Sequence, residues 1–187
     1  VTTRIVLEKL GASDYGIYSL LGGFVAMFTV LNSILSTGTS RFIALALGKK
    51  DLILQKKTFS TAFVIHLVIA VVVLILLESF GLWYINSNLN IDANRMVAAN
   101  WVFQFSAVSV ALTISQTPFT ASITAHEKFN IYAAMSVFDA VAKLLILYLL
   151  IVLPGDKLIV YASLLFGISF LNIVLTVSKS SKNVRCG

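Results

Sequence analysis

Charged residues are scarce in this chain: only 12% of its 187 residues are Asp, Glu, Lys or Arg. Ordinary globular domains are nearer a quarter charged, so the composition argues against a water-soluble domain. Proline is also rare, with two residues in the sequence, and its rarity lets long helices persist. The single cysteine, Cys186, excludes a disulfide framework within the chain and a cysteine-based metal site.

The sequence also lacks the common signatures of enzymes. It contains no Gly-rich phosphate loop, no HExxH and no CxxC, and His66 and His126 lack the further ligands of a zinc site. The net charge is +6, but the basic residues lie mostly between apolar runs, without the interleaved aromatics of a nucleic-acid surface. We therefore expect no enzyme, no cofactor and no nucleic-acid partner.

Long apolar runs make up most of the sequence. Five of them span approximately residues 15–37, 58–83, 98–121, 129–153 and 158–178. Crossing the hydrocarbon core of a bilayer takes about 20 helical residues, and each run is long enough. Between Ala62 and Leu77 the only polar residue is His66, whereas a soluble helix is polar along one face. The sequence thus predicts an all-α, polytopic integral membrane protein with about five transmembrane helices.

The basic residues between the runs predict an orientation. If all five runs span, segments 38–57, 122–128 and 179–187 share one side of the membrane and carry nine Lys and Arg, against four on the other side. The nine are Arg41, Lys49, Lys50, Lys56, Lys57, Lys128, Lys179, Lys182 and Arg185, and the four are Arg4, Lys9, Arg95 and Lys157. Cytoplasmic loops are enriched in Lys and Arg. We therefore expect the C-terminal tail to be cytoplasmic and the residue 1 side external, with a further helix before Val1.

Two runs carry polar or small residues at helical spacing. In lipid, a polar side chain is costly unless it faces another helix or a wet cavity. The first stripe is Ser19, Gly22, Ala26, Thr29, Ser33 and Ser36, and the second is Ser106, Ser109, Thr113, Gln116, Thr117 and Thr120. Close packing and a cavity-lining face both explain these stripes. For a cavity, the candidate contacts are Asn32, Thr113 and Gln116, and Pro118 predicts a kink near residues 113–117.

The fourth run carries two charges near its centre. Asp139 and Lys143 share one face with Tyr132 and Ser136, and their i,i+4 spacing lets them pair. Each charge costs about 2.5–3.5 kcal/mol on membrane-insertion scales, and pairing offsets only part of that cost. A structural ion pair and a site on an aqueous cavity both remain open.

Two further ionisable residues lie within the second run. For His66 we expect an interhelical hydrogen bond, or otherwise a contact with a proton or a head group. Glu78 lies close to the predicted outer end of the run, where a solvated or paired role is expected.

Several segments together resemble a known family of transporters. They are Arg4 with residues 10–18 (LGASDYGIY, including Gly11, Tyr15 and Gly16), Arg41 with residues 42–44 and 48–51, Pro118 with Phe119 and residues 125–130 (including His126 and Glu127), and Lys143 with Leu144. In order and spacing, over nearly the whole chain, they resemble bacterial polysaccharide-export flippases. These are the O-antigen and teichoic-acid type transporters of the multidrug/oligosaccharidyl-lipid/polysaccharide superfamily.

The resemblance implies an architecture. Residues 1–187 would form a partial N-terminal transmembrane lobe, helices two to six of a six-helix lobe, with the first helix and the second lobe missing. The protein would lie in the bacterial inner (plasma) membrane, with membrane lipids and the missing lobe as partners.

The resemblance also implies a function: flipping of a polyprenyl-diphosphate-linked oligosaccharide by alternating access, with coupling to an ion gradient left open. Lys143 would contact the head group or phosphate, Asp139 would hold Lys143 in place, and Gln116, Thr113 and Asn32 would meet sugar hydroxyls. Two alternatives stand beside this reading. One is a cation-coupled multidrug exporter of the same superfamily, and the other is a structural membrane subunit that transports nothing.

The predicted orientation has a direct test. A reporter fused at residues 48–52 should be active in the cytoplasm, and one fused at residues 88–92 should be active outside, because the first segment lies on the side richer in Lys and Arg. The opposite pattern of reporter activity defeats the predicted orientation.

Overall fold

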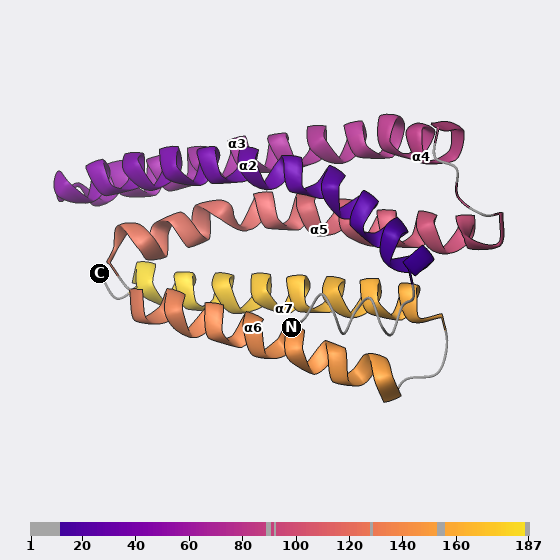
Figure 1. Cartoon of the computed structure of the whole chain (residues 1–187). Helices are drawn as coiled ribbons and strands as arrows, with labels where there is room; N and C mark the ends of the chain where they lie inside the picture. Colours follow the sequence, from indigo (N-terminus) through magenta and orange to yellow (C-terminus); the bar gives the residue numbers. More distant parts are fainter. Residues whose placement is uncertain (1–11, 89–90, 92, 128, 153–155, 186–187) are drawn as a thin grey trace.

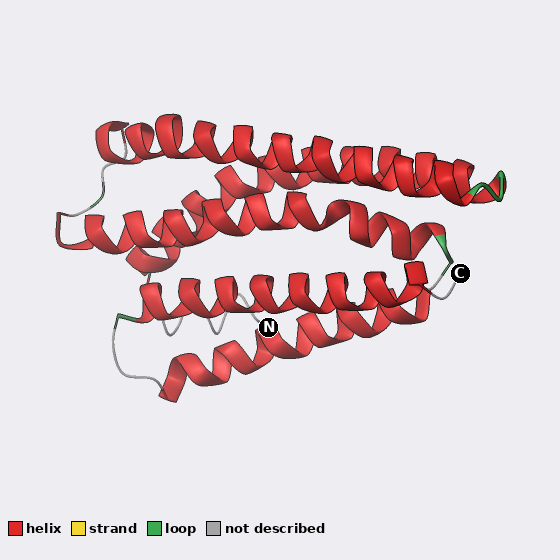
Figure 2. Ribbon diagram, turned by 180° about the vertical axis from the view of Figure 1, so that it is seen from behind, coloured by secondary structure: helices red, strands yellow, loops and turns green. Residues whose placement is uncertain are grey.

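The computed structural model describes residues 12–88, 91, 93–127, 129–152 and 156–185, and nearly all of them are helical (Figures 1 and 2). Arg4, Lys9, Gly11 and Lys128, which the sequence analysis singled out, lie outside the described residues, as does the side chain of Thr29.

The described part of the chain contains helices and no strand. They are α2 (Ala12–Gly48), α3 (Leu52–Leu76), the π-helical turn η1 (Leu77–Gly81), α4 (Leu82–Asn88), α5 (Ala93–Ala125), α6 (Phe129–Val152) and α7 (Lys157–Arg185). Within this part, five stretches are long and apolar enough to cross a membrane: Tyr15–Gly48, Leu52–Ser87, Arg95–Ala125, Phe129–Leu150 and Lys157–Ser178. The chain is therefore an all-α, polytopic membrane protein, as its apolar runs predicted.

Four of the five helical stretches are longer than the apolar runs, and α6 matches its run to within one residue in the described part of the chain. Segment 38–57 was predicted as a connection, yet only residues 49–51 separate α2 from α3. An apolar run marks the hydrocarbon layer, whereas backbone hydrogen bonding continues through Leu, Lys and Arg, which are good helix formers in water. Asp51 caps α3 by accepting hydrogen bonds from the backbone N–H groups of Ile53 (2.9 Å) and Leu54 (3.0 Å). Lys50 takes the left-handed conformation (φ 53°) that reverses the chain.

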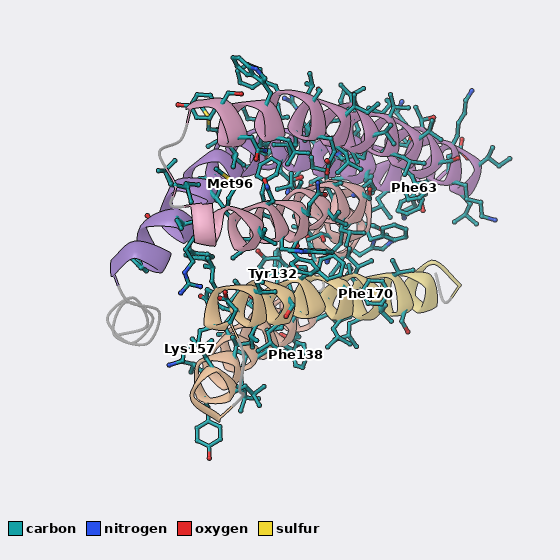
Figure 3. All side chains as sticks on the ribbon, turned by 90° about the vertical axis from the view of Figure 1, so that its right-hand side faces the viewer. Phe63, Met96, Tyr132, Phe138, Lys157 and Phe170 are labelled. Carbon is teal, nitrogen blue, oxygen red and sulfur yellow. The ribbon has the colours of Figure 1, made fainter. Side chains whose placement is uncertain are left out.

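Helix α5 lies at the centre of the bundle. In Figures 1 and 2, α3 and the later part of α2 run side by side on one side of α5, and α6 and α7 lie on the other. The first part of α2 crosses α5 toward the start of α7, where the rings of Tyr18 and Tyr161 lie 5.1 Å apart. Figure 3 looks along the bundle from the end at which α5 and α7 begin and shows the same arrangement. The core accordingly gathers along α5, where Val102, Phe103 and Ile114 are almost fully buried together with Leu21 of α2 and Leu158 of α7.

Proline at position 118 does not interrupt α5. The helix is continuous from Ala93 to Ala125 and is bowed rather than straight in Figures 1 and 2. Pro118 supplies no N–H to the carbonyl of Ile114. Beside it, the hydroxyls of Thr113 and Ser115 donate to the carbonyls four residues earlier, an arrangement that bends helices.

The outer surface is apolar over its membrane-spanning length. Large side chains such as Met27, Ile34, Ile75, Val137 and Leu144 are more than half exposed. On a protein in water such a surface would promote aggregation, whereas in a bilayer it meets acyl chains of equal polarity. The distribution of exposed apolar side chains thus agrees with the membrane assignment.

The π-helical turn η1 joins α3 to α4 and carries Glu78. Glu78 is partly buried, and its Oε2 accepts a hydrogen bond from Gln104 Nε2 of α5 at 2.8 Å. At the end of the turn, Gly81 packs directly against the ring of Phe103, so a Cβ atom at Gly81 would overlap that ring. The absence of a side chain at this position lets η1 approach α5.

Replacing Gly81 by Ala should therefore destabilise the protein by about 1–3 kcal/mol, the usual cost of overpacking a filled core. The matched control is Gly23→Ala in α2, where an added Cβ meets nothing within 4 Å and the helix gains roughly 0.5–1 kcal/mol. Unfolding in detergent mixtures, followed by circular dichroism, measures both. Adding Phe103→Leu to Gly81→Ala should recover part of the loss. Equal stability of the two glycine variants would contradict the packing argument.

Candidate functional site

A polar hollow of about 460 Å³ lies between α5, α6 and α7. Nearly all of its lining residues carry a polar side chain, the two exceptions being Ile123 and Met135. The polar ones are Thr113, Gln116, Thr120, Tyr132, Ser136, Asp139, Lys143, Ser169, Asn172 and Thr176. Hydroxyl and amide groups thus surround a single acid and a single base in the middle of membrane-spanning helices.

The acid and the base form an ion pair within α6. Lys143 Nζ lies 2.6 Å from Asp139 Oδ2, and Asn172 Nδ2 of α7 donates to Asp139 Oδ1 at 2.9 Å. Both carboxylate oxygens are therefore engaged, and Asp139 fixes the direction of the Lys143 side chain. That side chain is still 53% exposed. An ammonium group has three N–H donors and the bond to Asp139 uses one, so Lys143 can also donate to a ligand.

A chain of hydrogen bonds behind the ion pair joins α5 to α7. Gln116 Nε2 donates to Thr176 Oγ1 at 2.5 Å, and Thr176, which is fully buried, donates to the backbone carbonyl of Asn172 at 2.7 Å. Asn172 in turn holds Asp139. The charged pair is thus supported by groups whose own positions are fixed by packing and hydrogen bonds.

Two smaller hollows continue the polar face toward α2. One, of about 270 Å³, shares Asp139, Lys143 and Ser169 with the first hollow and adds Ser106, Ser109 and three aromatic rings. The other, of about 200 Å³, shares Ser169 and Thr113 and adds Asn32 of α2. Apolar and aromatic side chains such as Phe28, Phe105 and Phe166 line much of the two smaller hollows. Ser169 lines all three hollows, and we call their polar residues together the polar face. At its far end, Asn32 Oδ1 accepts a hydrogen bond from Thr117 Oγ1 at 2.6 Å.

The structure brings together most of the residues that the sequence proposed for a cavity. Asp139, Lys143, Gln116 and Thr113 line the same hollow, and Asn32 lines the adjoining one.

His66 lies elsewhere, between α2 and α3, buried to 2% exposure. The hydrogen bond of its Nδ1 is to the Ala62 carbonyl of its own helix at 2.8 Å, in place of the interhelical bond expected from the sequence. Its Nε2 has no partner among the described residues.

Apart from Lys143, the residues named for the family resemblance lie outside the hollow in the described part of the chain. Tyr15 and Gly16 lie near the start of α2, and Arg41 is exposed near its end. His126 and Glu127 form the turn after α5, where His126 Nδ1 bonds to the Ser122 carbonyl at 2.7 Å and Glu127 has a left-handed φ of 56°. These positions shape helix ends and turns.

Sequence reasoning missed the contribution of α7. Ser169, Asn172 and Thr176 recur at i, i+3 and i+7 on the face that lines the hollow. The spacing rule that found the stripes in α2 and α5 would have found this one. A second omission is the pair between Arg95 and Asp156, whose Nη1 and Oδ2 atoms lie 2.7 Å apart and join the starts of α5 and α7.

Comparison with protein-family models, curated proteins and solved structures found no match to this chain. The resemblance to polysaccharide-export flippases therefore stays a prediction from sequence, and the functional argument rests on the geometry of the polar hollow.

The hollow should be accessible to water. In a Cys186→Ser background, single cysteines replacing Ser109, Ser136 or Ser169, a nearly isosteric change, should react with a water-soluble thiol reagent because all three positions line the polar face. The controls are Val137→Cys and Leu144→Cys, which sit among exposed apolar residues of α6 and should be shielded by lipid. Complete protection at the three serine positions would contradict a wet cavity and would favour a structural subunit.

Proposed function

We propose that this chain is part of a transporter that moves a lipid-linked oligosaccharide across a bacterial plasma membrane. The observation that carries the proposal is the polar hollow lined by hydroxyl and amide groups around Asp139 and Lys143, placed within membrane-spanning helices. A lining of this composition matches a cargo rich in hydroxyl groups.

The chemistry of the cargo explains why such a lining is needed. A hydroxyl moved from water into pure hydrocarbon loses about 4–8 kcal/mol of hydrogen bonding, so a sugar head group does not cross a bilayer unaided. Thr, Ser, Asn and Gln side chains both donate and accept hydrogen bonds and can replace the lost water. Gln116, Thr113 and Asn32 remain the proposed contacts for sugar hydroxyls, and Ser136 and Ser169 join them.

The ion pair adds no net charge to the site, but it fixes the position of the Lys143 ammonium group. Asp139 and Lys143 cancel each other, so the pair does not create a broadly cationic cavity. Lys143 instead presents its remaining N–H donors from a position fixed by Asp139 and Asn172. We assign to Lys143 the contact with the phosphate or with a sugar hydroxyl next to it, and to Asp139 the positioning of Lys143.

We infer alternating access as the mechanism, and the open side of the hollow supports it. A half-exposed ion pair at this depth would be costly against lipid, so water or a second lobe should cover it. Rocking of two lobes about a central site is the usual mechanism of transporters built from repeats. The proposed orientation keeps the cationic connection between α2 and α3 in the cytoplasm.

A multidrug exporter for cations is favoured by the three aromatic rings of the second hollow but disfavoured by the pairing of Asp139. Such a cavity needs an acid whose charge is free to meet the drug, whereas Asp139, the acid of the described lining, is already neutralised by Lys143 at 2.6 Å. A purely structural subunit is favoured less as well, because polar faces that only join helices would close on one another and leave no hollows.

The decisive experiment compares two substitutions of one residue in the full-length protein that contains this segment. Lys143→Ala should lower the rate of lipid-linked oligosaccharide flipping by about 10- to 100-fold, because a hydrogen bond to a charged group contributes about 1.5–3 kcal/mol. Lys143→Arg keeps the charge and the donors and should retain most of the activity. Flipping in reconstituted vesicles measures both.

Lys157→Ala is the matched control, since Lys157 is exposed at the start of α7 and lines none of the polar hollows. A wild-type rate for Lys143→Ala removes Lys143 from the site. Transport of a cationic drug without any flipping of the sugar lipid would instead establish the exporter.

A further inference from the structure

A second large cavity lies on another face of the molecule, between α2 and α3. It measures about 580 Å³, and none of its lining residues lines the polar hollows. The lining consists of Ile34, Leu35, Gly38, Thr39 and Phe42 of α2 and of Leu54, Lys57, Thr58, Thr61, Ala62, Ile65 and His66 of α3. We call this cavity the α2–α3 groove.

The groove stays open because its facing positions carry small side chains. Gly38 faces Thr58, Thr61 and Ala62 across the groove, and a Cβ atom added at Gly38 would meet nothing within 4 Å. Large apolar side chains border it, and Phe42 and Ile34 are 66% and 68% exposed. An empty apolar groove is unfavourable, because the side chains that line it have no van der Waals partners on that side. Acyl chains of the surrounding lipids can fill the groove.

The length of the groove fits one acyl chain. From Leu54 to His66 the groove follows α3 for about 18 Å at about 1.5 Å per residue. Half of a bilayer's hydrocarbon thickness is about 15 Å. A chain that starts at the head-group level beside the α2–α3 turn would therefore run along the groove to about the bilayer midplane.

Basic residues cluster at the end of the groove nearest the turn. Lys57 lines the groove, and Lys49, Lys50, Lys56 and Arg41 are exposed around it. Asp51, the single acid of residues 38–57, accepts two backbone hydrogen bonds as the cap of α3. The apolar groove thus opens onto a strongly cationic rim, which is the charge pattern that an anionic head group complements.

We propose that the α2–α3 groove binds one acyl chain of an anionic phospholipid, with the phosphate of that lipid on Lys57. The bound lipid completes the packing between α2 and α3, while the neighbouring cations select against neutral head groups. This site is separate from the polar hollow and stands whether or not the chain belongs to a flippase.

The test measures lipids retained by the purified chain, using native mass spectrometry with phosphatidylglycerol or phosphatidylcholine of matched acyl chains. The wild type should retain phosphatidylglycerol preferentially. Lys57→Gln should lower the affinity for phosphatidylglycerol about fivefold, which is the effect of about 1 kcal/mol per basic residue near an anionic surface. Gly38→Leu and Thr61→Phe fill the groove from opposite helices, and each should abolish retention of both lipids.

Two controls separate the groove from general effects. Lys157→Gln removes one charge at the other end of the bundle, and Gly23→Leu adds the same bulk to α2 at a position that lines none of these cavities; both should retain lipid as the wild type does. Circular dichroism checks that each variant is folded. Equal retention of the two lipids by the wild type, equal losses in Lys57→Gln and Lys157→Gln, or full retention by folded Gly38→Leu or Thr61→Phe would each overturn the proposal.

Discussion

The hydrocarbon core of a bilayer offers no hydrogen-bond partner, so the polar groups of this chain that enter it need partners within the protein or in a wet cavity. The backbone meets this demand through long helices. The hydroxyls of Thr113 and Ser115 meet it by donating to carbonyls of their own helix. Longer side chains such as Gln116 and Asn172 reach across to other helices instead. The need for hydrogen-bond partners therefore explains both the helical backbone and the polar contacts around the hollow between α5, α6 and α7.

The ion pair in α6 shows how two opposing costs are balanced. Each charge at mid-membrane costs about 2.5–3.5 kcal/mol on insertion scales, and removing one partner of a buried pair costs still more. Asp139 is satisfied on both oxygens, by Lys143 and by Asn172, yet the Lys143 side chain is 53% exposed. A pair with a purely structural task would gain from being sealed between helices. Its partial exposure beside a hollow is the geometry that favours a site over a structural pair.

Sequence periodicity predicted much of the fold and part of the site, and its failures have physical reasons. The apolar runs located every membrane-spanning helix in the described part of the chain, because hydrocarbon thickness sets a minimum length. They underestimated the helix ends, since Arg41 and Lys56 continue helices into the head-group layer. The stripe rule placed Asp139 and Gln116 on a cavity, and applied to α7 it would also have marked Asn172. It says nothing about which helices meet, so the bond of Asn172 to Asp139 and the pair of Arg95 with Asp156 could come only from tertiary structure.

Two glycines of α2 lie in different environments along the helix. Gly22 lines the polar face shared with Ser106 and Ser109, whereas Gly38 lines the apolar groove beside α3, and at both positions an added Cβ would meet empty space. The glycines create room of the same kind, and the surrounding residues decide what fills it. Hydroxyls and an ion pair suit water and a hydrated cargo, whereas aliphatic side chains under a rim of lysines suit an acyl chain with an anionic head group. A single helix thus separates the space assigned to the cargo from the space assigned to the membrane lipid.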